Sequence, residues 1–101
     1  MKVNDSAEKY IEVKGLNTRY VVRGAGPPLL LIHGFGEFLE VWWFNIESLC
    51  QHYQVYAMDL PGHGLSAKPT DINYTLAFAR KFISDFMQAL GIEHAHLVGH
   101  S

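Results

Sequence analysis

Residues 29–36 read Leu-Leu-Leu-Ile-His-Gly-Phe-Gly, an apolar run followed by two glycines around a single side chain. Pro27 and Pro28 border the run, so loop signals bound it on both sides. A short, continuous apolar run between loop signals is typical of a strand that is buried on both faces. Strands of this kind belong to parallel sheets that helices cover, and the run therefore indicates an α/β protein.

A β-hairpin is predicted before this run. Ile11 and Val13 alternate with polar residues, which is the period of a strand with one buried face. Residues 15–17 supply turn chemistry, and residues 18–23 form a return strand rich in strand-forming side chains. Residues 24–28 then interrupt regular structure.

Helices and strands alternate after the run. The pattern predicts a helix over residues 40–51, a buried strand over 53–58, a helix that begins at about residue 75 and a third buried strand over 95–98. Thr75 is the expected N-cap of the second helix, and Gly91 is the expected residue just past its end. This order predicts the α/β fold class, with a hairpin followed by βαβαβ units in a parallel sheet. Apolar side chains at helical spacing are Trp42, Ile46, Leu49 and Cys50 in the first helix, and Ala79, Phe82, Ile83, Phe86 and Leu90 in the second.

Length and charge exclude several classes of protein. The chain has 101 residues, room for one domain, and its formal net charge of −2 argues against a nucleic-acid-binding domain. Its longest apolar run is far shorter than the ~20 residues that span a bilayer. The first ten residues lack the apolar core of a signal peptide, and Cys50 is the only cysteine, as in proteins of a reducing compartment. We therefore expect a cytoplasmic protein with no nucleic-acid partner and no transmembrane segment.

Six histidines raise the question of a metal site. His94 and His96 are two residues apart on a predicted strand and would face the same side. No partner carboxylate or cysteine lies at ligand spacing from them, so we expect no metal.

The loop after the first parallel strand is a candidate binding segment, because ligands of open α/β sheets collect where the strands end. Residues 33–36, His-Gly-Phe-Gly, allow a sharp turn that leaves amide N–H groups free to stabilise a developing oxyanion. The same tetrapeptide also fits a plain glycine loop between a strand and a helix, and taken alone it does not choose between these interpretations.

Residues 59–66 read Asp-Leu-Pro-Gly-His-Gly-Leu-Ser, a second shaped loop built around Gly62 and Gly64. Asp59 could ligate a metal or act as a catalytic acid. Its carboxylate could instead hold the loop by accepting backbone N–H bonds, and we favour this interpretation. Ser66 is interpreted as a turn or cap residue.

The chain ends on Gly99-His100-Ser101, the first half of the G-x-S-x-G nucleophile elbow. A serine on a sharp strand-to-helix turn needs a small residue two positions earlier, because the turn is crowded. Many loops contain G-x-S, and the motif gains weight here because it follows an apolar strand.

The order of these elements and motifs from about Tyr10 to Ser101 closely resembles the α/β-hydrolase fold superfamily. The resemblance implies that Ser101 is the catalytic nucleophile and that the amide of Phe35 is an oxyanion donor, supported by His33, Gly34 and Gly36. It also implies that neither His33 nor the histidines at positions 63 and 100 act as the catalytic base. Similar dehalogenases and epoxide hydrolases carry Asp at the elbow, whereas a serine implies acyl transfer to and from an ester-like small molecule without a cofactor.

Relatives of this fold are well over twice as long, and their catalytic acid, catalytic histidine and cap follow the nucleophile. We therefore expect residues 1–101 to be the N-terminal part of a hydrolase domain, inactive when isolated. A ligand-binding or receptor-type member of the fold and an inactive remnant stay open as alternatives.

Overall fold

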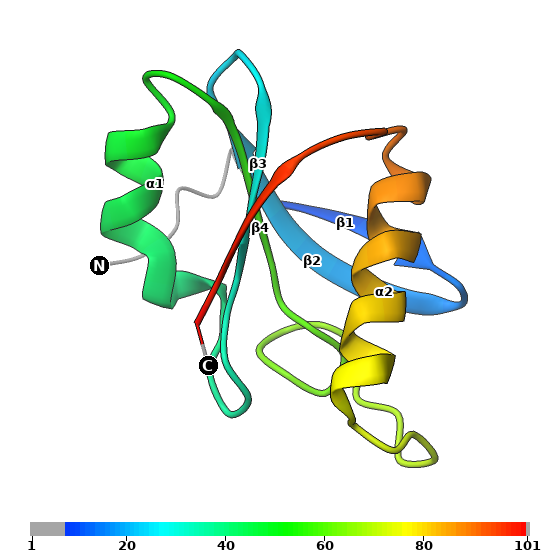
Figure 1. The fold of residues 1–101 in the computed structure, drawn as a ribbon. Helices are drawn as coiled ribbons and strands as arrows, with labels where there is room; N and C mark the ends of the chain where they lie inside the picture. Colours follow the sequence, from blue (N-terminus) through cyan, green and yellow to red (C-terminus); the bar gives the residue numbers. More distant parts are fainter. Residues whose placement is uncertain (1–7, 101) are drawn as a thin grey trace.

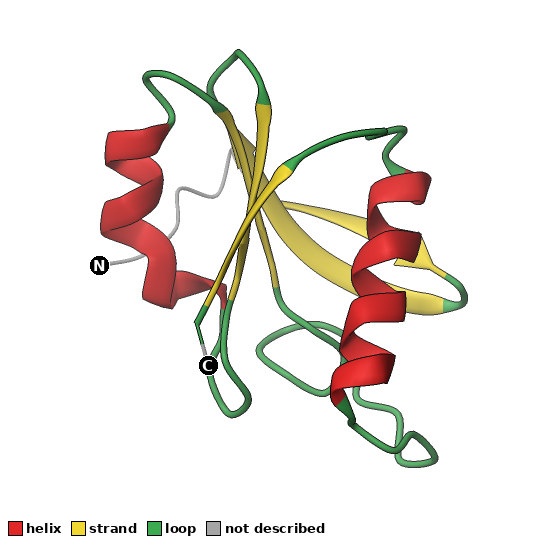
Figure 2. Cartoon of the chain, viewed as in Figure 1, coloured by secondary structure: helices red, strands yellow, loops and turns green. Residues whose placement is uncertain are grey.

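The structure is a computed structural model that describes residues 8–100. Within that range a five-stranded sheet lies between two α-helices (Figures 1 and 2). The elements are β1 (Glu8–Val13), β2 (Leu16–Arg23), β3 (Pro28–Ile32), the 3-10 helix η2 (Leu39–Trp42), α1 (Trp43–Leu49), β4 (Gln54–Met58), α2 (Leu76–Ala89) and β5 (His96–Gly99).

The hairpin turn is tighter than the sequence suggested. β1 and β2 pair in antiparallel register with Val13 opposite Leu16, so only Lys14 and Gly15 connect them. Both connecting residues have positive φ, 49° and 84°, as in the two-residue turns that match strand twist. The turn predicted over residues 15–17 is therefore wrong in its last two residues, because Leu16 and Asn17 already belong to β2.

The sheet has the order β1-β2-β4-β3-β5. β2 pairs with β4 in antiparallel fashion, while β3 pairs in parallel with β4 and with β5. The predicted βαβαβ arrangement after a hairpin is confirmed. β3 lies between two parallel neighbours and has helices on both faces, which explains its continuous apolar sequence.

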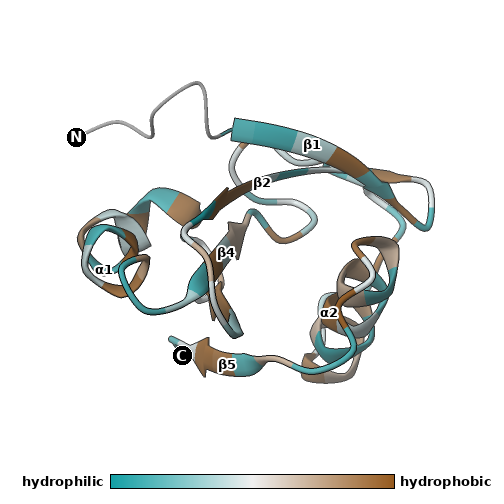
Figure 3. Cartoon of the chain, turned by 90° about the horizontal axis from the view of Figure 1, so that it is seen from above, coloured by the Kyte–Doolittle hydropathy of each residue, from teal (hydrophilic) through white to brown (hydrophobic). Residues whose placement is uncertain are grey.

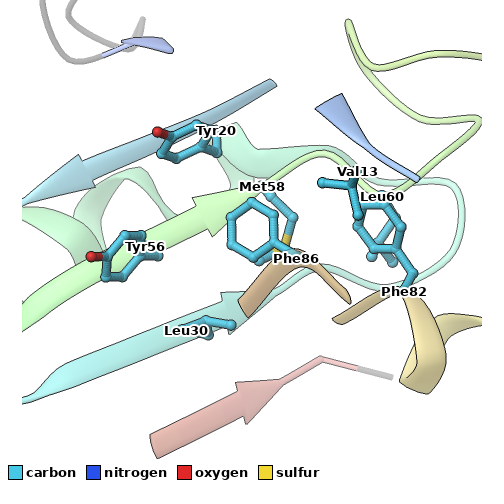
Figure 4. Packing of buried hydrophobic residues seen from close by; sticks show 8 residues of the cluster. All are labelled: Val13, Tyr20, Leu30, Tyr56, Met58, Leu60, Phe82 and Phe86. Atoms are coloured by element: carbon cyan, nitrogen blue, oxygen red, sulfur yellow. The ribbon is translucent and has the colours of Figure 1, made fainter. Parts of the chain in front are cut away.

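Figure 3 shows α1 and α2 on opposite sides of the sheet. Successive residues of the central strands face opposite helices. Leu29 and Leu31 contact the cluster under α1, whereas Leu30 joins the cluster under α2. Figure 4 shows the second cluster, in which Phe82 and Phe86 of α2 pack against the sheet. The other labelled members of this cluster are Val13, Tyr20, Tyr56, Met58 and Leu60.

Local signals define α2 at both ends, as predicted. The Thr75 hydroxyl accepts a hydrogen bond from the Phe78 N–H at 3.1 Å. Gly91 has a φ of 72°, and its N–H donates to the carbonyl of Gln88 at 3.1 Å. The N–H of Ile92 donates to the carbonyl of Met87 at 2.9 Å, which completes a Schellman motif.

The helix predicted over residues 40–51 is shorter and divided. It consists of η2 and α1, and the α-helical part ends at Leu49. Ile46 is fully buried in the cluster under α1, as its spacing predicted. In contrast, Phe44 of the same helix is 73% exposed.

The predicted burial of the last strand is wrong. It covers His96–Gly99, one residue later than expected, and all four of its residues are exposed. β5 is an edge strand of the described sheet, since β3 is its sole partner within residues 8–100. Leu97 and Val98 are 55% and 40% exposed. No helix among these residues is both long and apolar enough to cross a membrane.

Candidate active site

Three segments meet at one end of the sheet. β3, β4 and β5 run parallel, so their C-terminal ends share an edge (Figure 1). The β3–η2 loop (residues 33–38), the β4–α2 loop (residues 59–75) and His100 follow those ends. Open α/β sheets bind ligands at this edge.

The β3–η2 loop forms a tight turn that its own glutamate stabilises. The N–H of Glu37 donates to the carbonyl of Gly34 at 3.0 Å, and Gly36 occupies the turn with a φ of 86°. The Glu37 carboxylate accepts the N–H of Gly34 at 2.7 Å. Hydrogen bonds from His100 and from Gly34 hold the pKa of Glu37 below its ordinary value, so this carboxylate is ionised at neutral pH.

One of three successive amides in this loop is left without a partner. Gly34 donates to Glu37, and Gly36 donates to Nε2 of His63 at 2.9 Å. Between them, the N–H of Phe35 meets no acceptor among residues 8–100. The residue as a whole is 52% exposed.

His33 holds the β3–η2 loop against the β4–α2 loop. Its Nε2 accepts the N–H of Leu60 at 3.0 Å, so the ring proton lies on Nδ1 and is donated to the carbonyl of Gly34 at 2.8 Å. The side chain is 2% exposed, and this burial lowers the pKa of His33. With both nitrogens engaged, the ring has no free position at which to take a proton from a substrate.

Asp59 holds the β4–α2 loop through backbone N–H groups. One carboxylate oxygen accepts the N–H of Leu39 at 2.8 Å, and the other accepts the N–H of Leu65 at 2.9 Å. Ser66 adds long-range bonds, since its hydroxyl donates to the Asp59 carbonyl at 2.7 Å and accepts the N–H of Arg19 at 2.8 Å. These bonds join strands and loops, whereas the sequence suggested only a local turn or cap.

Sequence reasoning missed the residue that neutralises Asp59. The guanidinium of Arg19 is buried, and its Nε donates to Asp59 at 2.7 Å. The same guanidinium binds both oxygens of Glu40, at 2.6 and 2.9 Å. A charged residue within an otherwise strand-forming run was the signal that could have revealed it.

The two glycines of the β4–α2 loop are required for space and for conformation. Gly64 has a φ of 52°, and a side chain there would overlap the Asp59 carboxylate. Gly62 has a φ of 83°, and a Cβ would lie 2.6 Å from the Tyr74 hydroxyl oxygen. Both positions favour glycine on two independent grounds.

The candidate elbow begins beside the β3–η2 loop. Gly99 pairs with Ile32, and the N–H of His100 continues this pairing to the Ile32 carbonyl at 3.0 Å. Nδ1 of His100 lies 2.9 Å from the Glu37 carboxylate. A Cβ at Gly99 would meet no described atom within 4 Å, so crowding does not explain this glycine within residues 8–100. Ser101 lies outside the described residues.

An open apolar groove of about 520 Å³ runs from this edge along the face between β5 and α2. Phe35 and His100 lie at its border, next to the loops described above. Most of the residues along its wall are apolar, and they include Ile32 of β3, Ile83 and Met87 of α2, and Leu97 of β5.

The family model of the α/β hydrolase fold matches residues 27–101, and the chain belongs to this family. An acetyltransferase component of the acetoin cleaving system (dihydrolipoyllysine-residue acetyltransferase) from Cupriavidus necator is 45% identical over 95% of this chain and 26% of its own length. The 2-hydroxy-6-oxo-6-(2′-aminophenyl)hexa-2,4-dienoic acid hydrolase of Metapseudomonas resinovorans is 39% identical over 93% of this chain and 33% of its own length.

Among solved structures, a bacterial membrane phospholipase A superposes with a TM-score of 0.90 and 36% identity, over 93% of this chain and 31% of its own. The homologues thus include hydrolases of the α/β fold. The chain spans about a quarter to a third of the length of these relatives.

Proposed function

We propose that residues 1–101 form the first part of an α/β-hydrolase domain, and that the whole protein is a cytoplasmic serine hydrolase. Its substrate would be a small molecule with an ester-like carbonyl. The observation that carries this proposal is the N–H of Phe35, which meets no acceptor among residues 8–100 although the amides on both sides of it are engaged. A backbone N–H donor at the end of a parallel strand suits a developing oxyanion. Relatives named as a hydrolase and a phospholipase A support this reaction class.

In the proposed reaction, the hydroxyl oxygen of Ser101 attacks the substrate carbonyl carbon while a histidine outside residues 1–101 accepts its proton. The carbonyl oxygen gains the negative charge, and the N–H of Phe35 stabilises it. Collapse of this intermediate expels the alcohol, which receives the proton back from the histidine, and leaves an acyl-enzyme. Water then attacks the acyl carbon and releases the carboxylic acid. This sequence uses no metal or cofactor.

The test compares two serines in the whole protein. Ser101→Ala should lower turnover of an activated ester by about 10⁴-fold to 10⁶-fold and leave the fold intact, because the nucleophile is lost. Ser66→Ala should keep the turnover per folded molecule within a few-fold of wild type. It should also lower stability by about 1–3 kcal/mol, because two buried backbone groups lose their partner.

Labelling with an active-site phosphonate gives an independent readout. The phosphonate should modify the wild-type protein and the Ser66 variant, but not the Ser101 variant. An inactive Ser66→Ala protein beside an active Ser101→Ala protein would show that the nucleophile has been assigned wrongly.

A further inference from the structure

His63 has no role in the reaction proposed above, yet both of its ring nitrogens are engaged at the candidate site. Nε2 accepts the N–H of Gly36 at 2.9 Å, so the ring proton lies on Nδ1. That proton is donated to the carbonyl of Pro61, with 3.0 Å between the heavy atoms. The ring is therefore fixed to its own loop at one side and to the β3–η2 loop at the other.

Aromatic contacts reinforce this connection. The His63 ring stacks on Phe35, with centroids 6.0 Å apart and an interplanar angle of 27°. Tyr74 meets the His63 ring edge-on at 6.3 Å, and the His33 ring lies 4.9 Å from it. His63 thus contacts both the side chain of Phe35 and the backbone that follows it.

The two peptide planes around Phe35 are held from different sides. The plane that carries the Phe35 N–H also carries the Gly34 carbonyl, which accepts from Nδ1 of His33 and from the N–H of Glu37. The next plane carries the Gly36 N–H, which His63 holds. Because peptide units are planar, the first plane sets the direction of the Phe35 N–H. Holding the second plane as well restricts φ and ψ of Phe35, the two torsions through which the first plane could turn relative to the β4–α2 loop.

We propose that His63 is a positioning residue, which orients the Phe35 N–H toward the substrate oxyanion by holding Gly36. The inference rests on the proposed hydrolase function. Without the bond to His63, the peptide plane between Phe35 and Gly36 would lose its contact with the β4–α2 loop, and the Phe35 N–H would be held from one side only, through the Gly34 carbonyl. The donor would then spend part of its time turned away from the oxyanion, which lowers kcat more than it weakens substrate binding.

Two substitutions at position 63 separate the hydrogen bond from the bulk of the ring. His63→Phe keeps an aromatic ring beside Phe35 and removes the acceptor. His63→Gln keeps an acceptor, its side-chain carbonyl oxygen, at about the distance of Nε2 from the backbone. His94→Phe is the matched control, because His94 is an exposed histidine in the α2–β5 connection, away from both loops.

The measurements are kcat and KM of the whole protein on an activated ester, together with the exchange rate of the Gly36 amide proton. One net hydrogen bond corresponds to a factor of about three to ten. In His63→Phe, we expect kcat to fall by about threefold to tenfold with KM within about twofold, and Gly36 exchange to accelerate by a similar factor. His63→Gln should restore both values to within about twofold of wild type, and His94→Phe should change neither.

Three results would overturn the inference: wild-type kcat in His63→Phe, equal losses in His63→Phe and His63→Gln, or a change confined to KM. Thermal unfolding of each variant identifies a general loss of folded protein. A failure of the proposed hydrolase function would give a different result, because the Ser101→Ala protein would then keep its turnover of the ester. In that case the exchange rate of Gly36 still decides whether His63 holds the loop.

Discussion

His33 and His63 adopt the same protonation pattern at the candidate site. Each carries its proton on Nδ1, donates it to a nearby carbonyl and accepts a backbone N–H at Nε2. His33 of the β3–η2 loop accepts the N–H of Leu60 in the β4–α2 loop. In the opposite direction, His63 of the β4–α2 loop accepts the N–H of Gly36 in the β3–η2 loop. Each loop is therefore fixed by a histidine of the other.

Burial of His33 has a consequence for stability against acid. Its pKa is lowered from 6.5 in the folded protein, so the unfolded chain binds more protons between these two values. The contribution of His33 to the free energy of unfolding is therefore fully present above about pH 6.5. It is lost as the pH decreases toward the pKa of folded His33. The urea midpoint of the whole protein should be lower at pH 5.5 than at pH 7.5.

The control for this pH effect is His33→Gln, whose side-chain oxygen can still accept the Leu60 N–H but does not titrate. Its urea midpoint should decrease less between pH 7.5 and 5.5 than that of wild type. The neighbouring ionisable groups His63, Asp59 and Glu37 are present in both proteins, so their contributions largely cancel. Equal decreases in both proteins would contradict the assignment to His33.

At the scale of elements, Arg19 joins four of them. From β2 it reaches Glu8 in β1, Glu40 in η2 and Asp59 after β4. Burial alone would lower the pKa of Arg19, but the hydrogen bonds to Glu40 and Asp59 outweigh that effect and raise it. The guanidinium therefore stays charged and requires its partners.

Removing one partner should destabilise this junction strongly. Asp59→Ala is expected to lower the free energy of unfolding by about 3–5 kcal/mol, because it leaves part of a buried positive charge uncompensated. Glu47→Ala breaks the exposed pair with Arg23, in which the side chains are 31% and 49% exposed, and should cost at most about 1 kcal/mol. Urea unfolding measures both losses, and equal values would show that the buried pair has no special role.

Elements that depend on their own residues were predictable, and elements that depend on distant contacts were not. The cap at Thr75 and the left-handed Gly91 are local signals, and both ends of α2 followed from them. The start of η2 depends on Leu39 donating to Asp59, a contact between residues far apart in the sequence. In the candidate site, the glycines that allow the turn were visible in the sequence, whereas no local pattern shows that His63 engages Gly36.

At the scale of the whole molecule, an apolar surface lies open around β5. Leu97 and Val98 are exposed on this edge strand, and the groove beside α2 has an apolar wall. Exposed strand edges with apolar side chains favour edge-to-edge pairing between copies.

We expect the isolated chain of residues 1–101 to self-associate. Light scattering after size exclusion should give a mass above the 11.4 kDa of the monomer. Leu97→Lys should reduce the association, because a charge at a strand edge opposes pairing. Val41→Lys is the matched control, since Val41 is also exposed, at 43%, but lies in η2. A sharp monomer peak with cooperative unfolding for the unmodified chain would contradict this expectation.

The strand order also bears on how the chain reaches its folded state. β1 and β2 are joined by two residues, whereas Leu29 of β3 pairs with His96 of β5 across most of the chain. Closing a long segment costs more conformational entropy than closing a short one, so distant pairings form more slowly. We therefore expect the hairpin to form early and the alignment of β5 with β3 to form late. Since that alignment brings His100 to Glu37, the candidate site would be completed near the end of folding.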